Sequence, residues 1–361
     1  MKQNLKFFFK KLINKLWFRP LIFCLLSIAA ALLAHLADNS FIEDIAPDIA
    51  KSSLEYLLNT ISASMLVIAI FAVGSMVSAY SAASGTATPR SFKLIVSDDV
   101  SQNAFSVYIG SFIFSIVAAV ALKNGYYGAA GHFTLFILTL IVFAIIILTF
   151  LKWVERISKL GRIGHTIKKV EEATNKALCQ KLHQPFMGGS FVLDNIETGT
   201  PIYSEQIGYV QHINMERLQE LAAHNNLIII LKCIPGTFCY ADKPLACISS
   251  SDNNLVNIDN EKLVKAFTID DSRSFNDDPC FGIIALSEIA SRALSPGIND
   301  PGTAIAIIDS HVRLFTLWVK GKQTDRTVKV KYDRIRVPAI SLPNMFDDAF
   351  RPIARDGAGN I

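Results

Sequence analysis

The chain has 361 residues, of which 51% are hydrophobic, and a mean hydropathy of +0.35. This composition excludes an ordinary soluble protein, and the length allows a membrane domain followed by a soluble region. The formal net charge is +4, but residues 153–361 contain equal numbers of basic and acidic side chains, which argues against nucleic acid as a partner. The six cysteines form no CxxC pair, so we expect free thiols and no metal site.

Residues 1–19 alternate basic and apolar side chains, with Trp17 near the end. This pattern predicts a basic amphipathic helix on the cytoplasmic surface of a membrane. A signal peptide is the alternative interpretation, because a basic start is followed by an apolar stretch. No convincing cleavage site follows that stretch.

Four apolar segments follow, each close to the roughly 20 residues that cross the hydrocarbon core. They contain no Asp, Glu, Lys or Arg and lie at 20–37, 57–80, 104–122 and 133–151. Basic residues gather before the first segment, between the second and third, and after the fourth, whereas the loop between the first and second is acidic. Range 20–152 is therefore expected to be a domain of four transmembrane helices, with both termini in the cytoplasm.

Helical spacing divides the second segment into two faces. One is bulky and includes Met65, Ala69 and Met76. The other is mostly small or weakly polar and is formed by Thr60, Ser64, Phe71, Gly74, Ser75, Ser78 and Ala82, with Val67 and Gly85 on the same face. Helices in lipid associate through close backbone approach, so this second face predicts a helix-packing seam or the lining of a homo-oligomeric pore. In a pore, Phe71 would form a hydrophobic constriction.

The third segment also carries small residues, among them Gly110 and Ser115. We therefore expect the second and third helices to face each other or a neighbouring copy. The fourth segment is nearly all Ile, Leu and Phe and is expected to face lipid. After it, range 153–184 has apolar residues at helical spacing, which predicts an amphipathic connecting helix.

Beyond residue 185 the pattern changes to short β-like runs. These lie at 191–193, 208–213, 227–233, 238–240 and 245–248, with a short helix at 215–224. Their spacing is similar to half of a lipoyl- or biotinyl-type barrel, so range 185–250 is expected to be a small β-barrel-like domain. Lys243 lies in a connecting turn, where those barrels do not carry the modified lysine, and no cofactor is expected.

Range 251–361 is expected to be an α+β cytoplasmic domain with a strand at 263–269 and helices at 281–294 and 301–320. Between these helices, SPGIND predicts a corner in which Asn299 or Asp300 caps the second helix and Pro301 occupies its first turn. Gly297 is expected to adopt the unusual backbone angle. Glu288 and Arg292 are four residues apart, a spacing that favours an ion pair.

This helix-loop-helix corner is a candidate ligand site, because a helix N-terminus favours an anion. The polar residues that we expect to converge there are Arg273, Asp277, Glu288, Arg292, Ser295, Asn299 and Asp300. The alternative is a rigid corner that needs these residues only for capping. The combination of Gly, Asn, Asp and Pro favours that alternative.

Four features carry a resemblance to a known family: LWFRP at 16–20, the S, PR and F pattern at 84–92, DDPCFGI at 277–283 and ALSPGINDP at 293–301. Together they resemble an uncharacterised bacterial family of predicted four-span membrane proteins, catalogued as a domain of unknown function. The resemblance covers nearly the whole chain and implies a multi-pass protein of the bacterial inner (plasma) membrane with a cytoplasmic C-terminal region. It implies no activity or substrate. It also implies further helices after a segment like 349–360.

No catalytic motif is found: the sequence lacks a nucleophile elbow, a zinc-protease motif and a nucleotide-binding loop. The apolar segments also lack the ionisable groups of proton-coupled carriers and the symmetry of secondary transporters. We therefore expect a homo-oligomeric ion or small-solute channel that is gated by its cytoplasmic domain. The alternatives are a membrane-anchored ligand-sensing or scaffolding protein without a pore, and an unrecognised enzyme that uses the corner. The expected partners are the lipid bilayer, further copies of the chain and an unidentified cytosolic ligand or protein.

Overall fold

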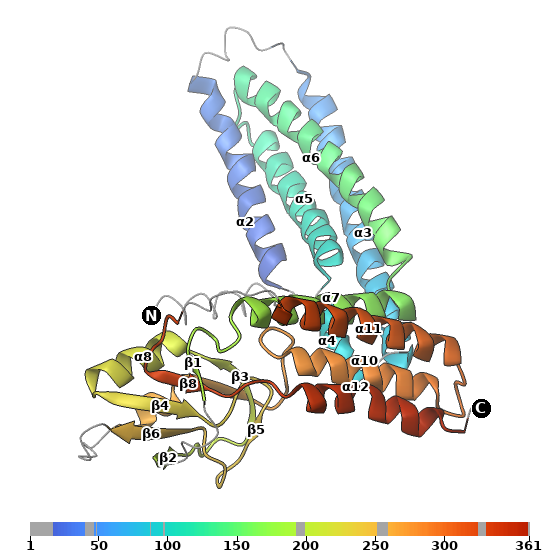
Figure 1. The fold of residues 1–361 in the computed structure, drawn as a ribbon. Helices are drawn as coiled ribbons and strands as arrows, with labels where there is room; N and C mark the ends of the chain where they lie inside the picture. The colour runs from blue at the N-terminus through green and yellow to red at the C-terminus, as the bar shows by residue number, and fades with distance from the viewer. Residues whose placement is uncertain are drawn as a thin grey trace. The chain divides into compact units, whose positions relative to one another are not determined.

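The computed structural model describes residues 17–39, 47, 49–86, 88–96, 98–192, 199–250, 259–323 and 330–359. The predicted amphipathic helix at 1–19 lies outside these residues except for its last three. The chain divides into two compact units, Met1–His165 and Thr166–Ile361. Figure 1 shows the elements of both units.

The first unit is built from four apolar helices that are long enough to cross a membrane. They are α2 (Phe18–Leu33) with the 3-10 turn η1 (Ala34–Asn39), α3 (Lys51–Thr86), α5 (Asp99–Lys123) and α6 (Ala129–Ile157). Each contains one of the predicted apolar segments, so the expectation of four apolar helices is confirmed. A short helix, α4 (Pro89–Val96), packs against the end of α3 through a small apolar cluster that contains Ala83, Ile95 and Leu160.

α5 is the central helix of this unit. It packs against α2, α3 and α6, and 56% of its most apolar window is buried, against 17–28% in the other three helices. A Cβ atom on Gly110 would lie 3.1 Å from Oγ of Ser27 and 3.2 Å from Cβ of Phe23. The small residue at position 110 therefore allows close approach of α2, whereas the sequence associated it with the second helix.

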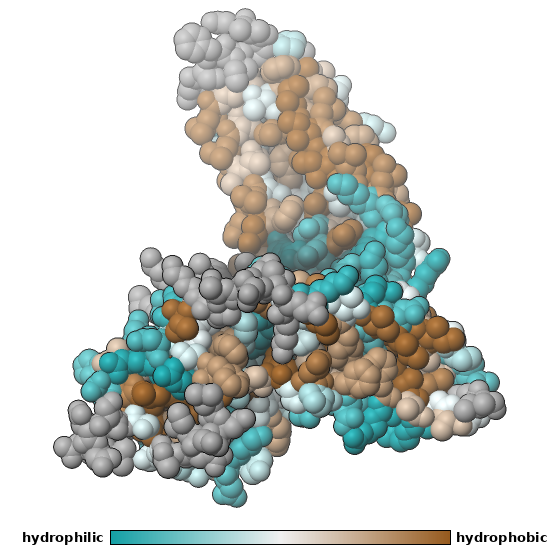
Figure 2. Space-filling view, in the orientation of Figure 1, coloured by the Kyte–Doolittle hydropathy of each residue, from teal (hydrophilic) through white to brown (hydrophobic). Residues whose placement is uncertain are grey.

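α6 turns bulky apolar side chains outward. Its exposed residues include Ile137, Leu140, Ile141, Phe143, Ile145, Leu148 and Leu151. Figure 2 shows the hydrophobic surface that such residues give the helical bundle. This exposure agrees with a helix that faces lipid.

The predicted continuous helix at 153–184 is interrupted. α6 ends at Ile157, and α7 (Ile163–His183) begins after a turn in which Gly161 has a φ of +84°. A Cβ atom on Gly161 would lie 3.3 Å from the carbonyl oxygen of Ala79 and 3.3 Å from Cβ of Ala82. The helix breaks because a left-handed glycine is packed against α3 at this point.

The second unit contains two small sheets, with strand orders β1-β8-β4-β6-β2 and β5-β3-β7. Their strands are β1 (Ser190–Phe191), β2 (Thr200–Ile202), β3 (Gly208–Ile213), β4 (Leu227–Leu231), β5 (Phe238–Cys239), β6 (Ala246–Ser250), β7 (Phe267–Asp270) and β8 (Ile335–Val337). β8 is parallel to β1 and β4, and all other pairs are antiparallel.

The predicted barrel is wrong: the strands that the structure describes form two open sheets and no closed barrel. β8 comes from near the C-terminus and lies between β1 and β4, while β7 takes the edge of β3 that a barrel would need. The sheets thus combine strands from both predicted soluble ranges around one core, which includes Val210, Ile229, Ile269 and Ile335.

The helices of this unit are α7 from Thr166 onward, α8 (Met215–His224), α9 (Asn260–Val264), α10 (Pro279–Ala293), α11 (Pro301–Gln323) and α12 (Leu342–Gly357). α8, α10 and α11 are the predicted helices, whereas α9 and β7 share the range predicted as one strand. α10, α11 and α12 pack together. α7 crosses α10 closely, because a Cβ atom on Gly282 would lie only 1.8 Å from Oγ1 of Thr174.

His311 is buried between α10, α11 and α12. Its side chain is fully buried, and Nε2 lies 3.1 Å from Oγ of Ser287, which also donates a hydrogen bond to the carbonyl oxygen of Ala349. Burial lowers the pKa of His311 to about 4, although Glu171 acts in the opposite direction. The native state therefore keeps this imidazole neutral at pH values where an unfolded chain would protonate it.

The free energy of unfolding of these helices should fall as the pH drops from about 6.5 to about 4, because only the unfolded state takes up the His311 proton in this window. The expected slope is about 1.4 kcal/mol per pH unit. This slope can be measured by hydrogen exchange of the α11 amides in the detergent-solubilised full chain, with the exchange rates corrected for the intrinsic effect of pH. His311→Gln should flatten the slope, whereas His224→Gln at an exposed position should not. Equal slopes in wild type and His311→Gln would contradict this assignment.

Candidate functional site

α3 has three distinct sides when its residues are placed at about 100° per residue. The side buried in the bundle contains Ile61, Met65, Ala69, Ala72 and Met76. A bulky exposed side contains Leu66, Ile70, Val73 and Val77. A third side, which we call the small side, is also exposed and contains Thr60, Ser64, Gly74, Ser78 and Ala82, with the bulkier Val67 and Phe71 among them and the half-buried Ser75 at its edge. The residues that the sequence grouped on this face therefore lie together, on the outer surface of the bundle.

The small side makes few contacts within the bundle. A Cβ atom on Gly74 or Gly85 would have no neighbouring heavy atom within 4 Å. Phe71 is 64% exposed, although its ring centroid lies 6.1 Å from that of Trp153 on α6. The hydroxyl of Thr60 donates to the carbonyl oxygen of Tyr56 at 2.8 Å. Apart from Ala82, which packs near the Gly161 turn, the small residues of α3 are thus not explained by packing within one copy.

Large side chains fill the interior of the bundle. Tyr108 and Trp153 are buried and meet edge to face, with 6.4 Å between ring centroids. Met65, Ala69 and Ile146 belong to the same apolar cluster, and a second cluster surrounds Phe114 and Leu135. This packing leaves the outward side of α3 as the weakly polar surface of the unit.

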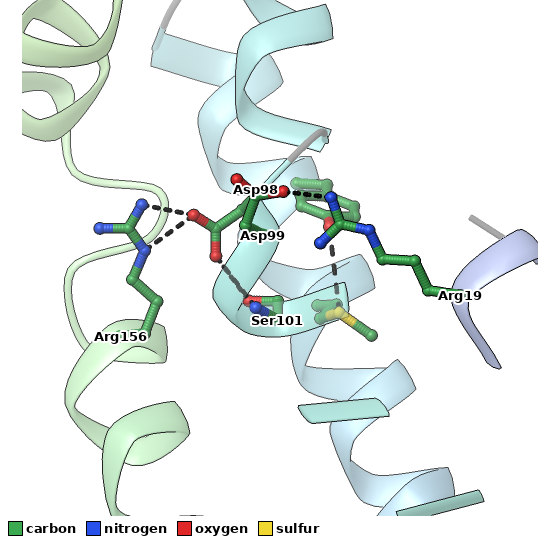
Figure 3. Close-up of polar contacts among 7 residues, drawn as sticks. Arg19, Asp98, Asp99, Ser101 and Arg156 are labelled. Atoms are coloured by element: carbon green, nitrogen blue, oxygen red, sulfur yellow. Dashed lines mark hydrogen bonds and ion pairs between the residues drawn. The ribbon is translucent and has the colours of Figure 1, made fainter. Parts of the chain in front are cut away.

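Two ion pairs meet at the first residues of α5 (Figure 3). Nε and Nη2 of Arg156 at the end of α6 donate to Oδ1 of Asp98, the Nε distance being 2.8 Å. Nη2 of Arg19 at the start of α2 donates to Oδ1 of Asp99 at 2.5 Å, and its Nη1 donates to Asn103 at 3.0 Å. The start of α5 is therefore connected by charge to two other helices.

Asp98 is the more buried of these two carboxylates, with 2% of its side chain exposed. Its Oδ2 accepts the backbone N–H of Ser101 at 3.1 Å, so Asp98 is also the N-cap of α5. Burial alone would raise the pKa of Asp98, but Arg156 and Ser101 outweigh it and hold the pKa below its usual value. These charged residues lie outside the predicted apolar segments, and their pairing leaves no signal in the sequence.

The SPGIND corner is organised by capping. Oδ1 and Oδ2 of Asp300 accept hydrogen bonds from N and Oγ1 of Thr303 at 3.1 and 2.6 Å, and α11 begins at Pro301 as expected. The left-handed residue is Asn299, with a φ of +48°, and the expectation for Gly297 is wrong. Asn tolerates this conformation because its short polar side chain can hydrogen-bond locally. Ser295 donates to the carbonyl oxygen of Arg292 at 2.6 Å.

Arg273 and Asp277 do not lie at this corner. They flank the N-terminus of α10, whereas Ser295, Asn299 and Asp300 follow its C-terminus. The 15 residues of α10 separate the two groups by about 22 Å at 1.5 Å per residue. Glu288 and Arg292 lie within α10 itself. Of the seven residues of the predicted ligand site, Arg273 and Asp277 thus lie at one end of α10, and the residues of the SPGIND corner lie at the other, with Glu288 and Arg292 along the helix between them.

A buried charged cluster surrounds the start of α10. Nε and Nη2 of Arg273 donate to Oδ2 and Oδ1 of Asp278 at 2.7 and 2.9 Å, and Nδ1 of His212 on β3 lies 2.7 Å from Oδ2 of Asp277. Asp278 also caps α10, since Oδ1 accepts the N–H of Phe281 at 3.2 Å. Lys181 on α7 is 7% exposed and interacts electrostatically with both aspartates.

The Pro-Gly turn before β5 closes this cluster. Gly236 has a φ of +95°, and a Cβ atom there would lie 2.3 to 2.8 Å from the carboxyl group of Asp278. Cys280 follows in the first turn of α10, and burial raises its thiol pKa to about 12. This thiol is therefore protonated at neutral pH and is a poor nucleophile. The cluster is suited to binding through its cations more than to thiol chemistry.

Four long apolar helices and a separate α+β unit define a membrane protein with an attached folded domain. The chain belongs to the DUF2254 family, described as predicted membrane proteins, which matches residues 13–361. The resemblance to an uncharacterised membrane-protein family is thus confirmed. Comparison with curated proteins and with solved structures gives no match.

Removing one partner of the Asp98–Arg156 pair should destabilise the bundle, because it leaves a buried charge without compensation. Arg156→Met is expected to cost about 3–5 kcal/mol. Thermal unfolding in detergent measures this loss, and the double variant Asp98→Asn/Arg156→Met should recover part of it. Lys159→Met, which removes an exposed pair with Glu155, should cost less than about 1 kcal/mol. Similar losses in the two single variants would show that burial of Asp98 does not govern the pair.

The corner provides a second test of backbone geometry. Asn299→Ala should destabilise α11 by about 1 kcal/mol because alanine disfavours a positive φ, whereas Asn299→Gly should be nearly neutral. Gly297→Ala should be tolerated, since a Cβ there meets no atom within 4 Å. Thermal unfolding of the three variants compares them directly. A larger loss for Gly297→Ala than for Asn299→Ala would reverse the assignment of the left-handed residue.

Proposed function

We propose that this protein is a homo-oligomeric membrane channel for ions or small solutes, with the small side of each α3 helix facing the centre of the assembly. The observation that supports this proposal is the exposure of Thr60, Ser64, Gly74 and Ser78 on the outside of a packed bundle. Two other helices of the bundle differ from α3. α5 packs its Gly110 against α2, and α6 exposes bulky apolar residues.

Lipid gives no reason for such a surface. Acyl chains cannot hydrogen-bond to hydroxyls, and a glycine exposed to lipid gains neither packing nor apolar contact. Close approach of a second helix uses the space at Gly74 and Gly85, and a hydrated path uses the hydroxyls of Thr60, Ser64 and Ser78. The bulky side of α3 would meanwhile face lipid, as α6 does.

The channel would run between copies. The interior of one bundle is filled by Tyr108, Phe114, Trp153 and their neighbours, so a path requires several α3 helices around an axis. Phe71 would narrow this path, because it is the exposed aromatic residue on the small side of α3. The turn at Gly161 joins α7 to α6. In our proposal, α7 transmits conformational change in the second unit to α6 through this turn.

The distribution of basic residues supports a bacterial inner-membrane location with both termini in the cytoplasm. In this topology Arg19, Asp98 and Arg156 would lie at the cytoplasmic boundary of the bundle. A membrane-anchored ligand sensor without a pore is the second candidate function. It is favoured by the charged cluster at the start of α10, where the buried Lys181 has no hydrogen bond or ion pair with the residues that the structure describes.

Reconstituted full-length protein in planar bilayers tests the channel. Wild type should conduct, Ser78→Leu should reduce the conductance severalfold by adding bulk to the path, and Phe71→Ala should increase it by widening the constriction. Ile70→Leu is the matched control, because it changes an apolar residue on the bulky side of the same helix. Its conductance should equal that of wild type.

Absence of conductance from well-folded oligomers would remove the channel and leave the sensor. Equal effects of Ser78→Leu and Ile70→Leu would show that the small side does not line the path.

A further inference from the structure

Lys181 lacks close partners for a buried cation. Its side chain is on α7 and is 7% exposed, yet its ammonium makes no hydrogen bond or ion pair with any residue that the structure describes. An ammonium carries three N–H donors, and burying them without acceptors is costly. Burial accordingly lowers the pKa of Lys181, despite opposing effects of Asp277, Asp278 and Cys280.

The nearby carboxylates already have other partners. Asp277 is paired with His212 at 2.7 Å, and both oxygens of Asp278 accept hydrogen bonds from Arg273. The third carboxyl, Asp348 on α12, has its pKa raised by burial. None of these carboxylates makes a hydrogen bond or ion pair with the Lys181 ammonium in the part of the chain that the structure describes.

Arg273, which interacts with the same Asp278 as Lys181, offers a further donor. Its Nε and Nη2 are used by Asp278, and the guanidinium lies 5.4 Å from the ring centroid of Phe281, which fixes its orientation. Nη1 has no hydrogen bond within the described ranges. Arg273 and Lys181 thus keep donors available near the positive end of a 15-residue helix.

We propose that the start of α10 binds a phosphate group, held by Lys181 and by Nη1 of Arg273. A phosphate dianion accepts several hydrogen bonds from different directions and is favoured both by paired cations and by a helix N-terminus. It would satisfy the donors of Lys181 without displacing the Arg273–Asp278 pair. This site is independent of the proposed channel, because it lies entirely within the second unit.

Thermal unfolding of the full chain tests the site with two sources of phosphate. One series adds inorganic phosphate at constant ionic strength to protein in phosphatidylcholine nanodiscs, and the other replaces part of the lipid by phosphatidic acid. Wild type should gain thermal stability in at least one series. Lys181→Met should raise the apparent Kd for that source by about tenfold or more. Lys176→Met, at an exposed position on the same helix, should behave as wild type.

The two series identify the source. A response to inorganic phosphate that depends on Lys181 assigns a free phosphate or phosphomonoester, and a Lys181-dependent response to phosphatidic acid alone assigns a lipid headgroup. No response of wild type in either series, or a response that Lys181→Met and Lys176→Met change equally, would overturn the proposal. If Lys181→Met fails to fold, the wild-type series still shows whether the protein responds to phosphate. Lys181→Gln then takes the place of Lys181→Met in the comparison with Lys176→Met.

Discussion

Packing around α5 is the constraint on which the membrane unit depends. This helix is the most buried of the four, and its first residues make the ion pairs with Arg19 and Arg156 that connect it to α2 and α6. Since α5 occupies the centre, each of the other three helices buries one side against it. The residues on the remaining sides must suit whatever those sides contact, which is lipid, water or another copy of the chain. α6 carries bulky apolar residues there. α3 carries a bulky side and a small side.

The proposed channel rests on the difference between the exposed sides of α3 and α6. Both helices are long and apolar, and both turn most of their most apolar window outward. The outward residues of α6 match lipid, whereas hydroxyls and glycines on α3 match a helix surface or water. In the second unit, an analogous mismatch marks the start of α10: Lys181 is placed where its neighbours are already paired. In each unit, the candidate site includes groups that lack partners among the described residues of the same unit.

Sequence patterns predicted the features that depend on long, uniform segments. A membrane crossing requires about 20 apolar residues, and this requirement made all four apolar helices visible. α8, α10 and α11 were found because their periodicity and capping residues are local. By contrast, β1 and β5 have two residues each, and β8 joins the sheet from a distant part of the chain, so their pairing left no local signal. The break at Gly161 depends on contact with α3, which helical spacing alone does not reveal.

The candidate sites show the same limit. The residues of the small side were identified because helical periodicity alone groups them. Arg273 and Asp277 were selected as chemically suitable, but which end of α10 they occupy follows from the fold. Lys181 resembled any lysine of an amphipathic helix, since its burial follows from tertiary packing that helical spacing does not show. At the corner, Gly297 and Asn299 can both adopt a positive φ, and the sequence favoured the wrong residue.

The central claim is that the small side of α3 contacts another copy of the chain within the membrane. Cysteine crosslinking in native membranes tests it most directly, with Ser78→Cys compared with Ile70→Cys in a background from which the six natural cysteines have been removed. Our account predicts efficient crosslinking between copies at position 78 and little at position 70. Crosslinking at position 70 alone, or at neither position, would contradict it.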